Sequence, residues 1–212
     1  MRLGIFGGSF DPIHYGHLLL AETCREQCGL DQVLFVPAAV PPHKQERRMT
    51  SSRTRVEMLD MATAGNERFA ISTIEIDRGG VSFTIDTLTA LSAEFAGAAL
   101  FLLMGADSLS EMPTWRKPQE ICRLAIPLVV RRAGSPAPDF SSLIPLVAAE
   151  RLDEIRDHQV EMPVIELSST EIRQRVAAGR TIRYRTPRAV EKFIETHKLY
   201  RQHNEVDDAA VP

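Results

Sequence analysis

Short continuous runs of apolar residues alternate along the chain with longer segments in which apolar residues recur every three or four positions. The continuous runs, which are typical of buried β-strands, lie at 3–6, 33–36, 69–76, 100–104, 126–130 and 164–167. Segments with helical spacing lie at 18–28, 56–64 and 87–95. Because parallel strands need crossover connections, and helices are the usual ones, this alternation predicts a mostly parallel sheet with helices on both faces. We therefore expect a doubly wound, Rossmann-like α/β fold with a small helical C-terminal portion.

The length of 212 residues is enough for one well-filled core, so we expect a single domain over residues 1–201. Residues 202–212 are polar and acidic without periodicity, which predicts a mobile tail. Residues 131–140 include Gly134, Pro136 and Pro138 and are expected to form a surface loop, not a domain boundary.

Composition narrows the class of protein. With 44% apolar and 25% charged residues, the chain is typical of globular proteins, and its net charge of −3 argues against a general nucleic-acid binder. Cys24, Cys28 and Cys122 form no CxxC pair or disulfide framework, which favours a reducing compartment and argues against a metal site. Without a signal-like apolar region or a run long enough for a membrane span, we expect a cytoplasmic protein.

Polar motifs follow several of the predicted strands. They lie at 7–9 after the first strand, 37–44 after the second, 105–108 after the fourth and 167–170 after the last. Ligands of open α/β sheets bind at the carboxyl ends of the strands, where the connecting loops diverge. We therefore expect these four segments to converge on one rim of the sheet.

The stretch GGSFDPIHYGHL at 7–18 is the most informative of these segments. Its adjacent glycines let backbone N–H groups approach a phosphate or a base, yet it matches neither GxGxxG nor a P-loop with its lysine. His14 and His17, with Gly16 opening the next helix, can donate hydrogen bonds to phosphate oxygens at a helix N-terminus. The alternative is that one histidine caps this helix while the other fills a gap.

Residues 7–17 resemble the signature of the HxGH nucleotidyltransferase superfamily and are most similar to the bacterial nicotinate-nucleotide adenylyltransferases. The segments PPHK at 41–44, SFTIDTL at 82–88, 105–115 and SSTEIR at 168–173 follow in that family's order. Two residues depart from the family pattern: Phe83 stands where tyrosine is common, and Leu167 where isoleucine is common. The resemblance extends from residue 3 to about residue 200.

This resemblance implies an enzyme of NAD biosynthesis. The 5′-phosphate of nicotinic acid mononucleotide would attack the α-phosphorus of ATP directly, giving nicotinic acid adenine dinucleotide and pyrophosphate. Holding two polyanions in line and neutralising their charge would then carry the reaction. Mg²⁺ is implied as a cofactor on the ATP phosphates, and because it needs few protein ligands we expect no metal motif. We assign Asp11 to hydrogen bonding within its own loop.

The same resemblance implies roles for individual residues. His14, His17, Lys44 and Arg173 would be catalytic. ATP would be bound by Gly7, Gly8, Ser9, Phe10, Gly105, Asp107, Ser168, Ser169 and Thr170. Ser168 and Glu171 also form an S-x-x-E capping box, which we interpret as the way that an anion site is held. Asp107 would contact a ribose hydroxyl or, alternatively, cap a helix.

The mononucleotide would be bound by His43, Thr84 and Trp115, with Trp115 on the pyridine ring and Thr84 with backbone N–H groups at the carboxylate. That arrangement would select the acid over the amide. Trp115 is otherwise explained as an aromatic residue of the core. Arg131 and Arg132 end a predicted strand at the rim, where they are either further phosphate contacts or surface residues.

Other functions stay open at this point. They are another HxGH nucleotidyltransferase, such as a phosphopantetheine adenylyltransferase or a cytidylyltransferase, a class I aminoacyl-tRNA synthetase, and a catalytically silent nucleotide-binding protein. The joint presence of Thr84 and Trp115 argues against the first, and the length argues against the second. The third is disfavoured by the intact set His14, His17, Lys44 and Arg173. The expected partners are ATP and nicotinic acid mononucleotide, without nucleic acid or membrane, and a homo-oligomer is compatible with the sequence.

Overall fold

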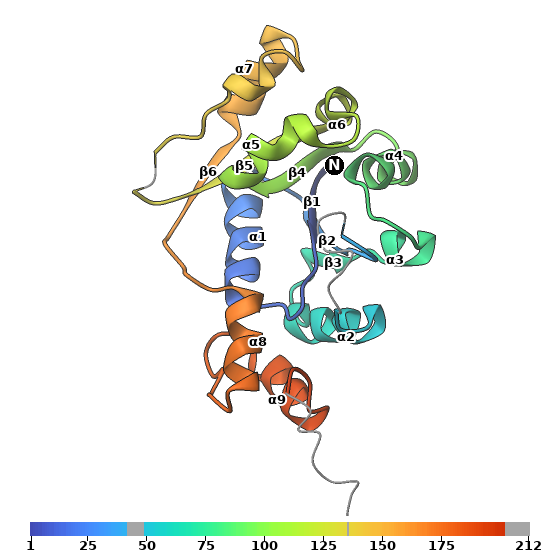
Figure 1. Cartoon of the computed structure of the whole chain (residues 1–212). Helices are drawn as coiled ribbons and strands as arrows, with labels where there is room; N and C mark the ends of the chain where they lie inside the picture. Colours follow the sequence, from blue (N-terminus) through green and yellow to red (C-terminus); the bar gives the residue numbers. More distant parts are fainter. Residues whose placement is uncertain (42–48, 135, 202–212) are drawn as a thin grey trace, which may run out of the picture.

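A computed structural model describes residues 1–41, 49–134 and 136–201 (Figure 1). Six strands form one sheet in the order β3-β2-β1-β4-β5-β6, and every neighbouring pair is parallel. The strands are β1 (Arg2–Gly8), β2 (Gln32–Pro37), β3 (Phe69–Ile71), β4 (Ala99–Gly105), β5 (Ala125–Arg132) and β6 (Gln159–Met162). The strand order reverses between β1 and β4, so the loops that leave these two neighbours diverge at the carboxyl edge.

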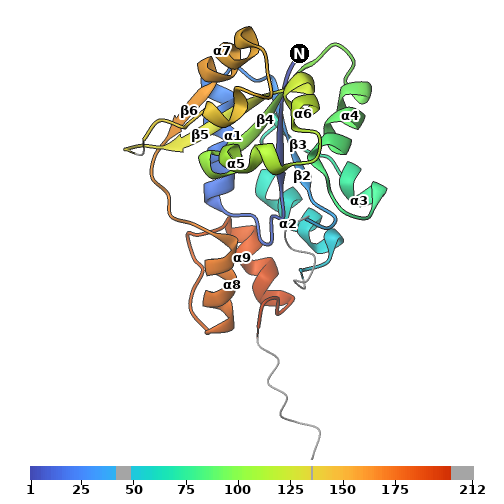
Figure 2. The ribbon, with the colours of Figure 1, turned by 45° about the horizontal axis from the view of Figure 1, so that its top comes forward.

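Helices cover both faces of the sheet, as predicted. Figure 1 shows α1 on one side of the strands, with α4 and α6 packed together on the other. The helices are α1 (Tyr15–Gln27), α2 (Ser52–Thr63), α3 (Ile74–Arg78), α4 (Thr84–Glu94), α5 (Ala106–Glu111), α6 (Pro118–Leu124), α7 (Ala149–Asp157), α8 (Ser169–Ala177) and α9 (Arg188–Thr196). Figure 2 shows α8 and α9 side by side below the sheet, as the small helical C-terminal portion. The doubly wound α/β prediction is confirmed.

The core lies on both faces of the central strands. Leu3, Val33, Phe101 and Leu128 are fully buried, one in each of β1, β2, β4 and β5. Strands that are covered on both faces read as continuous apolar runs, which is why the pattern located these four correctly. The three helices predicted at 18–28, 56–64 and 87–95 all begin three or four residues earlier, because their first turns carry polar or capping residues that the apolar spacing does not mark.

Two predicted strands are wrong in whole or in part. Of 69–76 only Phe69–Ile71 is a strand, and the chain turns at Thr73 to begin α3. Residues 164–167 lie in an extended connection to α8, whereas the sixth strand is Gln159–Met162. This strand lies at the sheet edge and is buried on one face only, so its apolar residues alternate with polar ones. Pro163, which cannot donate to the ladder, follows its last residue.

The remaining features concern the cysteines, segment 131–140 and the end of the chain. Cys24 and Cys122 are buried and Cys28 is half-buried, all as free thiols. Segment 131–140 starts inside β5, which continues to Arg132, and the irregular part begins after it. Within the described ranges, no helix is both long and apolar enough for a membrane span. The predicted tail at 202–212 lies outside the described residues.

Candidate active site

A cavity of about 750 Å³ opens beyond the carboxyl ends of β1 and β4, where the strand order reverses. Its walls come from the loop after β1, the start of α1, the start of α5, the end of β5, residues 136–139 and the start of α8. This volume is within the range of sites that take small-molecule ligands. Three of the four segments predicted to converge on one rim therefore meet here. Of the fourth, 37–44, the described residues 37–41 do not line the cavity.

Most residues predicted to bind ATP or to act in catalysis share this cavity. Those that line it are Ser9, Phe10, His14, His17, Gly105, Asp107, Arg131, Ser168, Ser169, Thr170 and Arg173. Gly7 and Gly8 precede the lining segment in β1. His43 and Lys44 lie outside the described residues, as does the side chain of Arg132. The structure thus assembles the predicted set from five segments, while the role of each residue stays a prediction.

His14 and His17 form a reciprocal capping box at the start of α1. The His14 Nδ1 atom accepts a hydrogen bond from the His17 backbone N–H, and the His17 Nδ1 atom accepts one from the His14 N–H, both at 3.3 Å. The rings stack with centroids 3.6 Å apart and planes inclined by 19°. Gly16 permits this stacking, because a Cβ atom there would lie 3.1 Å from the His14 ring. Both histidines therefore take part in capping α1.

This capping arrangement determines where the imidazole protons are. A ring nitrogen that accepts a hydrogen bond carries no proton, so each neutral ring has its proton on Nε2. His14 is only 5% exposed, and burial lowers its pKa to about 4, which keeps the ring neutral at pH 7. Because both residues line the cavity, an anion there meets oriented N–H donors beside the positive end of the α1 dipole.

The buried His14 ring predicts a pH-dependent stability. Between about pH 6.5 and pH 4 the unfolded chain binds a proton at His14 whereas the folded chain does not, so the free energy of unfolding falls as the pH is lowered through this window. Below about pH 4 both states are protonated and this loss ends. Urea denaturation at pH 7 and pH 5 should show a smaller decrease for His14→Asn, which keeps an acceptor for the His17 N–H. An equal decrease in both proteins would contradict this assignment.

Phe10 supports His17 from behind. Its ring lies edge-on to the imidazole with centroids 5.1 Å apart, and it makes a similar contact with Phe6 at 5.4 Å. A Cβ atom on Gly8 would lie 2.8 Å from the Phe10 ring, so Gly8 is needed for internal packing as well as for the predicted approach of a ligand. A Cβ atom on Gly7 would meet nothing within 4 Å, which leaves its backbone accessible.

The start of α8 forms the opposite wall of the cavity. The Ser168 hydroxyl accepts the Glu171 backbone N–H at 3.1 Å, which confirms one half of the predicted capping box. The Glu171 carboxylate accepts from Arg185 at 3.0 Å, which draws it towards the segment that follows α8. The Ser169 hydroxyl donates to the Pro12 carbonyl at 2.8 Å and so joins α8 to the loop after β1.

Arg173 strengthens the same junction. Its Nη1 donates to the carbonyl of Asp11, and its Nη2 donates to the Thr170 hydroxyl at 3.0 Å. As the fifth residue of α8, Arg173 begins the second helical turn. The guanidinium therefore bridges α8 and the histidine-bearing loop while lining the cavity with a positive charge.

Asp11 corrects one expectation, because its bonds are not local. Its Oδ1 atom accepts the Tyr200 hydroxyl at 2.6 Å, and its Oδ2 atom accepts the Thr50 N–H at 3.3 Å. Nearby, Thr186 donates to the Ile13 carbonyl at 2.7 Å. The loop is packed between the start of α2 and the C-terminal portion, so its buried polar atoms find distant partners. The C-terminal portion thereby fixes the loop that carries both histidines.

Arg55 is a residue of this region that sequence reasoning missed. It is only 1% exposed and donates to the carbonyls of Ser9 at 2.8 Å, Ala38 at 2.7 Å and Thr50 at 3.1 Å. One buried guanidinium therefore joins the loops that follow β1 and β2. An arginine inside a helical pattern is typical of a surface position, so no signal in the sequence marks this one.

The remaining wall of the large cavity comes from residues that follow β4 and from the end of β5. Asp107 is exposed in the first turn of α5, whose N-cap is Gly105, so the alternative in which Asp107 caps the helix is wrong. Arg131 forms an ion pair with Glu161 across the β5–β6 register while also lining the cavity. Residues 136–139, expected only to be a surface loop, contribute a further part of the lining. Their position after a strand at the carboxyl edge was the available signal.

A smaller cavity of about 210 Å³ joins the two residues predicted to recognise the pyridine ring. Thr84 and Trp115 both line it, together with Ser82, Phe83, Thr114, Arg116 and Ile121. Trp115 is half-buried and packs against the core, so its structural explanation and its predicted role are both compatible with this position. Residues 105–116 contribute to both cavities.

The chain is similar to known proteins over most of its length. A family model described as cytidylyltransferase-like matches residues 5–175. A protein of Thermomicrobium roseum named "Probable nicotinate-nucleotide adenylyltransferase" is 46% identical over 200 residues, covering 94% of this chain and 92% of its own length. A protein of the same name from Rhodopirellula baltica is 40% identical and covers 94% and 93%.

Among solved structures, the fold is similar to that of a Plasmodium falciparum nicotinic acid mononucleotide adenylyltransferase complexed with NaAD. The TM-score is 0.71, and the match covers 94% of this chain and 97% of the other. The sequence identity is 14%, so this likeness concerns the fold alone.

Proposed function

The chain belongs to the cytidylyltransferase-like family, and from this membership we propose that it transfers the adenylyl group of ATP to nicotinic acid mononucleotide. The products are nicotinic acid adenine dinucleotide and pyrophosphate, a step of NAD biosynthesis. The relatives with this name cover 94% of the chain, and the family model covers residues 5–175, which include the lining of both cavities.

One observation carries the chemical proposal: two stacked imidazoles and one guanidinium face the same cavity in fixed orientations. Because each Nδ1 is used in the capping box, the Nε2–H groups of His14 and His17 are the donors for the α-phosphate. Arg173, held by Asp11 and Thr170, stands at the start of α8 for the leaving pyrophosphate. These donors need little reorganisation when negative charge develops in the transition state.

The enzyme supplies no nucleophile in this mechanism. The mononucleotide 5′-phosphate attacks the α-phosphorus in line, and pyrophosphate leaves on the opposite side. The His14 ring, which is neutral at pH 7, serves as a hydrogen-bond donor and takes no proton from the substrate. We propose that Trp115 stacks on the pyridine ring in the small cavity and that Thr84, at the start of α4, meets its carboxylate.

We propose that ATP is used as its Mg²⁺ complex, which neutralises phosphate oxygens. In the described part of the chain no three His, Cys, Asp or Glu residues come together as a metal site. Mg²⁺ in nucleotide sites keeps water and phosphate ligands with one or two protein carboxylates, and Asp107 provides such a carboxylate in the large cavity.

Pyrophosphate release tests this function. The protein is incubated with Mg²⁺ and ATP or CTP, and with nicotinic acid mononucleotide, nicotinamide mononucleotide or phosphopantetheine as acceptor. We expect release with ATP and nicotinic acid mononucleotide, less with the amide, and none with phosphopantetheine. Release only with CTP or only with phosphopantetheine would overturn the assignment within the family, and no release with any pair would favour a catalytically silent nucleotide-binding protein.

We also propose three further properties of the protein. They are a cytoplasmic location, a single catalytic domain over residues 1–201, and the absence of nucleic-acid and membrane partners. Equilibrium ultracentrifugation of the purified chain would measure the oligomeric state directly.

A further inference from the structure

We infer that Arg116 determines substrate specificity: its guanidinium favours the carboxylate of the mononucleotide over the amide at the small cavity. This inference rests on the proposed function and adds a residue to it. None of the sequence motifs singled out Arg116 as a contact.

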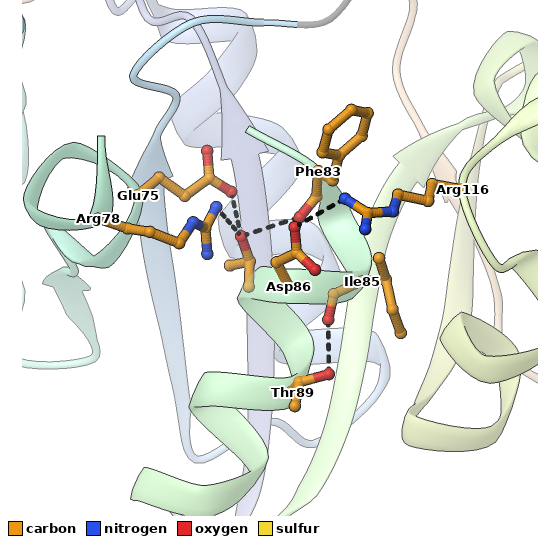
Figure 3. A network of polar contacts seen from close by, with 8 residues as sticks. Glu75, Arg78, Phe83, Ile85, Asp86, Thr89 and Arg116 are labelled. Carbon is orange, nitrogen blue, oxygen red and sulfur yellow. Dashed lines mark hydrogen bonds and ion pairs between the residues drawn. The ribbon is translucent and has the colours of Figure 1, made fainter. Parts of the chain in front are cut away.

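Arg116 is held at the beginning of α4 by two contacts. Its guanidinium carbon lies 4.9 Å from the centroid of the Phe83 ring, which also lines the small cavity. Its Nη1 lies 3.5 Å from Oδ2 of Asp86, in the first turn of the same helix. Figure 3 shows the Arg116 side chain reaching from a neighbouring segment towards Phe83 and Asp86. The cation therefore stands beside the turn that begins with Thr84.

The first turn of α4, which Arg116 contacts, is itself held by contacts with α3. Thr87, one turn into α4, donates to the buried Glu75 carboxylate at 2.5 Å, and Arg78 donates to the Thr87 hydroxyl at 3.3 Å (Figure 3). Both partners come from α3, so α3 and α4 are joined through one threonine. These contacts fix α4 against α3, so the start of α4 that Arg116 contacts is held in place.

The small cavity carries little other charge. Among the described residues that line it, Arg116 alone is ionised, and the rest are Ser, Phe, Thr, Trp and Ile side chains. The N-cap of α4 is Phe83, which makes no side-chain capping bond, so the first N–H groups of the helix add partial positive charge. Asp86 offsets part of the Arg116 charge, and both side chains are about half exposed, which limits the size of the effect.

The two mononucleotides differ only at the ring substituent, so comparing them isolates this charge. Both carry the same 5′-phosphate and ribose, and attraction of distant cations to the phosphate cancels in the ratio. A carboxylate gains from a nearby guanidinium, whereas a carboxamide gains little. Loss of the Arg116 charge should therefore raise the KM for the acid without changing the KM for the amide.

The test measures kcat/KM for nicotinic acid and nicotinamide mononucleotide in wild type, Arg116→Gln and Arg116→Lys. We expect Arg116→Gln to reduce the acid-to-amide ratio about fivefold, chiefly through the KM for the acid, as for a partly exposed charge pair. Arg116→Lys should keep more of the ratio, because it keeps the charge. The control is Arg123→Gln on α6, an exposed arginine paired with Glu120 that does not line the cavity.

The outcomes separate the two levels of the argument. If wild type turns over neither pyridine mononucleotide, the proposed function fails. If wild type prefers the acid but Arg116→Gln keeps the same ratio, or lowers kcat/KM equally for both substrates, the inference about Arg116 fails alone. An equal loss of ratio in Arg123→Gln would also overturn it, because the effect would then be one of general charge.

Discussion

Replacing His17 with alanine is expected to lower kcat by at least about 100-fold, which is typical of removing one donor that stabilises a transition state. The Nδ1 atom of His17 accepts the His14 N–H, so its proton is on Nε2. Stacking on His14 and the edge-on contact with Phe10 fix this donor before substrate arrives. The KM for the mononucleotide should change much less, because the donor acts on charge that develops during the reaction.

Two further substitutions at His17 separate catalysis from capping. Asparagine keeps an acceptor near the Nδ1 position for the His14 N–H but has no donor near Nε2, whereas glutamine places an N–H₂ group near Nε2. Steady-state kinetics should therefore rank His17→Gln above His17→Asn. Replacing the exposed His197, at the end of α9, with alanine is the control and should leave kcat unchanged. A kcat for His17→Asn within about threefold of wild type would rule out the donor role.

Local patterns were sufficient to predict the framework of the fold. β1, β2, β4 and β5 are buried on both faces, so burial alone makes their sequences continuously apolar. β6 escaped prediction because it lies at the sheet edge, where Val160 and Met162 alternate with exposed Gln159 and Glu161. Alternation over four residues is too short to distinguish from chance in a polar region.

The cavity was predicted in outline because its residues belong to short motifs at the carboxyl ends of strands. Parallel topology brings those ends to one edge, so His14, Gly105 and Ser168 meet although they are far apart in sequence. The stacking of the two imidazoles was not foreseeable in detail. It depends on Gly16 and on the entry angle of the chain into α1, which spacing does not encode.

Contacts between distant segments account for the rest. Tyr200 donates to Asp11 across 189 positions, and Arg55 joins carbonyls of the two loops that follow β1 and β2. Neither residue has a sequence neighbour that points to its partner, and each looks like an ordinary surface or terminal residue. These long-range bonds hold the loop that carries His14. The contacts that fix the position of this histidine were therefore not predictable from the sequence.

Replacing Arg173 with alanine is expected to lower kcat/KM for ATP by at least about 100-fold. The guanidinium lines the cavity at the start of α8, where the helix N-terminus and the Thr170 hydroxyl also attract an anion. Its bonds to the Asp11 carbonyl and to Thr170 set its position, so lysine, a point charge without the planar fork, should restore only part of the rate.

A second variant separates two causes of the Arg173→Ala effect, which are the loss of charge in the cavity and the loss of stability of α8. Arg175, on the same helix, donates to the Thr181 carbonyl and pairs with Glu171, and it does not line the cavity. Arg175→Ala therefore removes an arginine from α8 without removing cavity charge, and its kcat/KM should stay near the wild-type value. Thermal denaturation of both variants shows how far each weakens the fold. Of the two arginines, only Arg173 lines the cavity. An equal rate loss in Arg175→Ala and Arg173→Ala would therefore contradict a role of the Arg173 charge in the cavity and would assign the effect to the stability of α8.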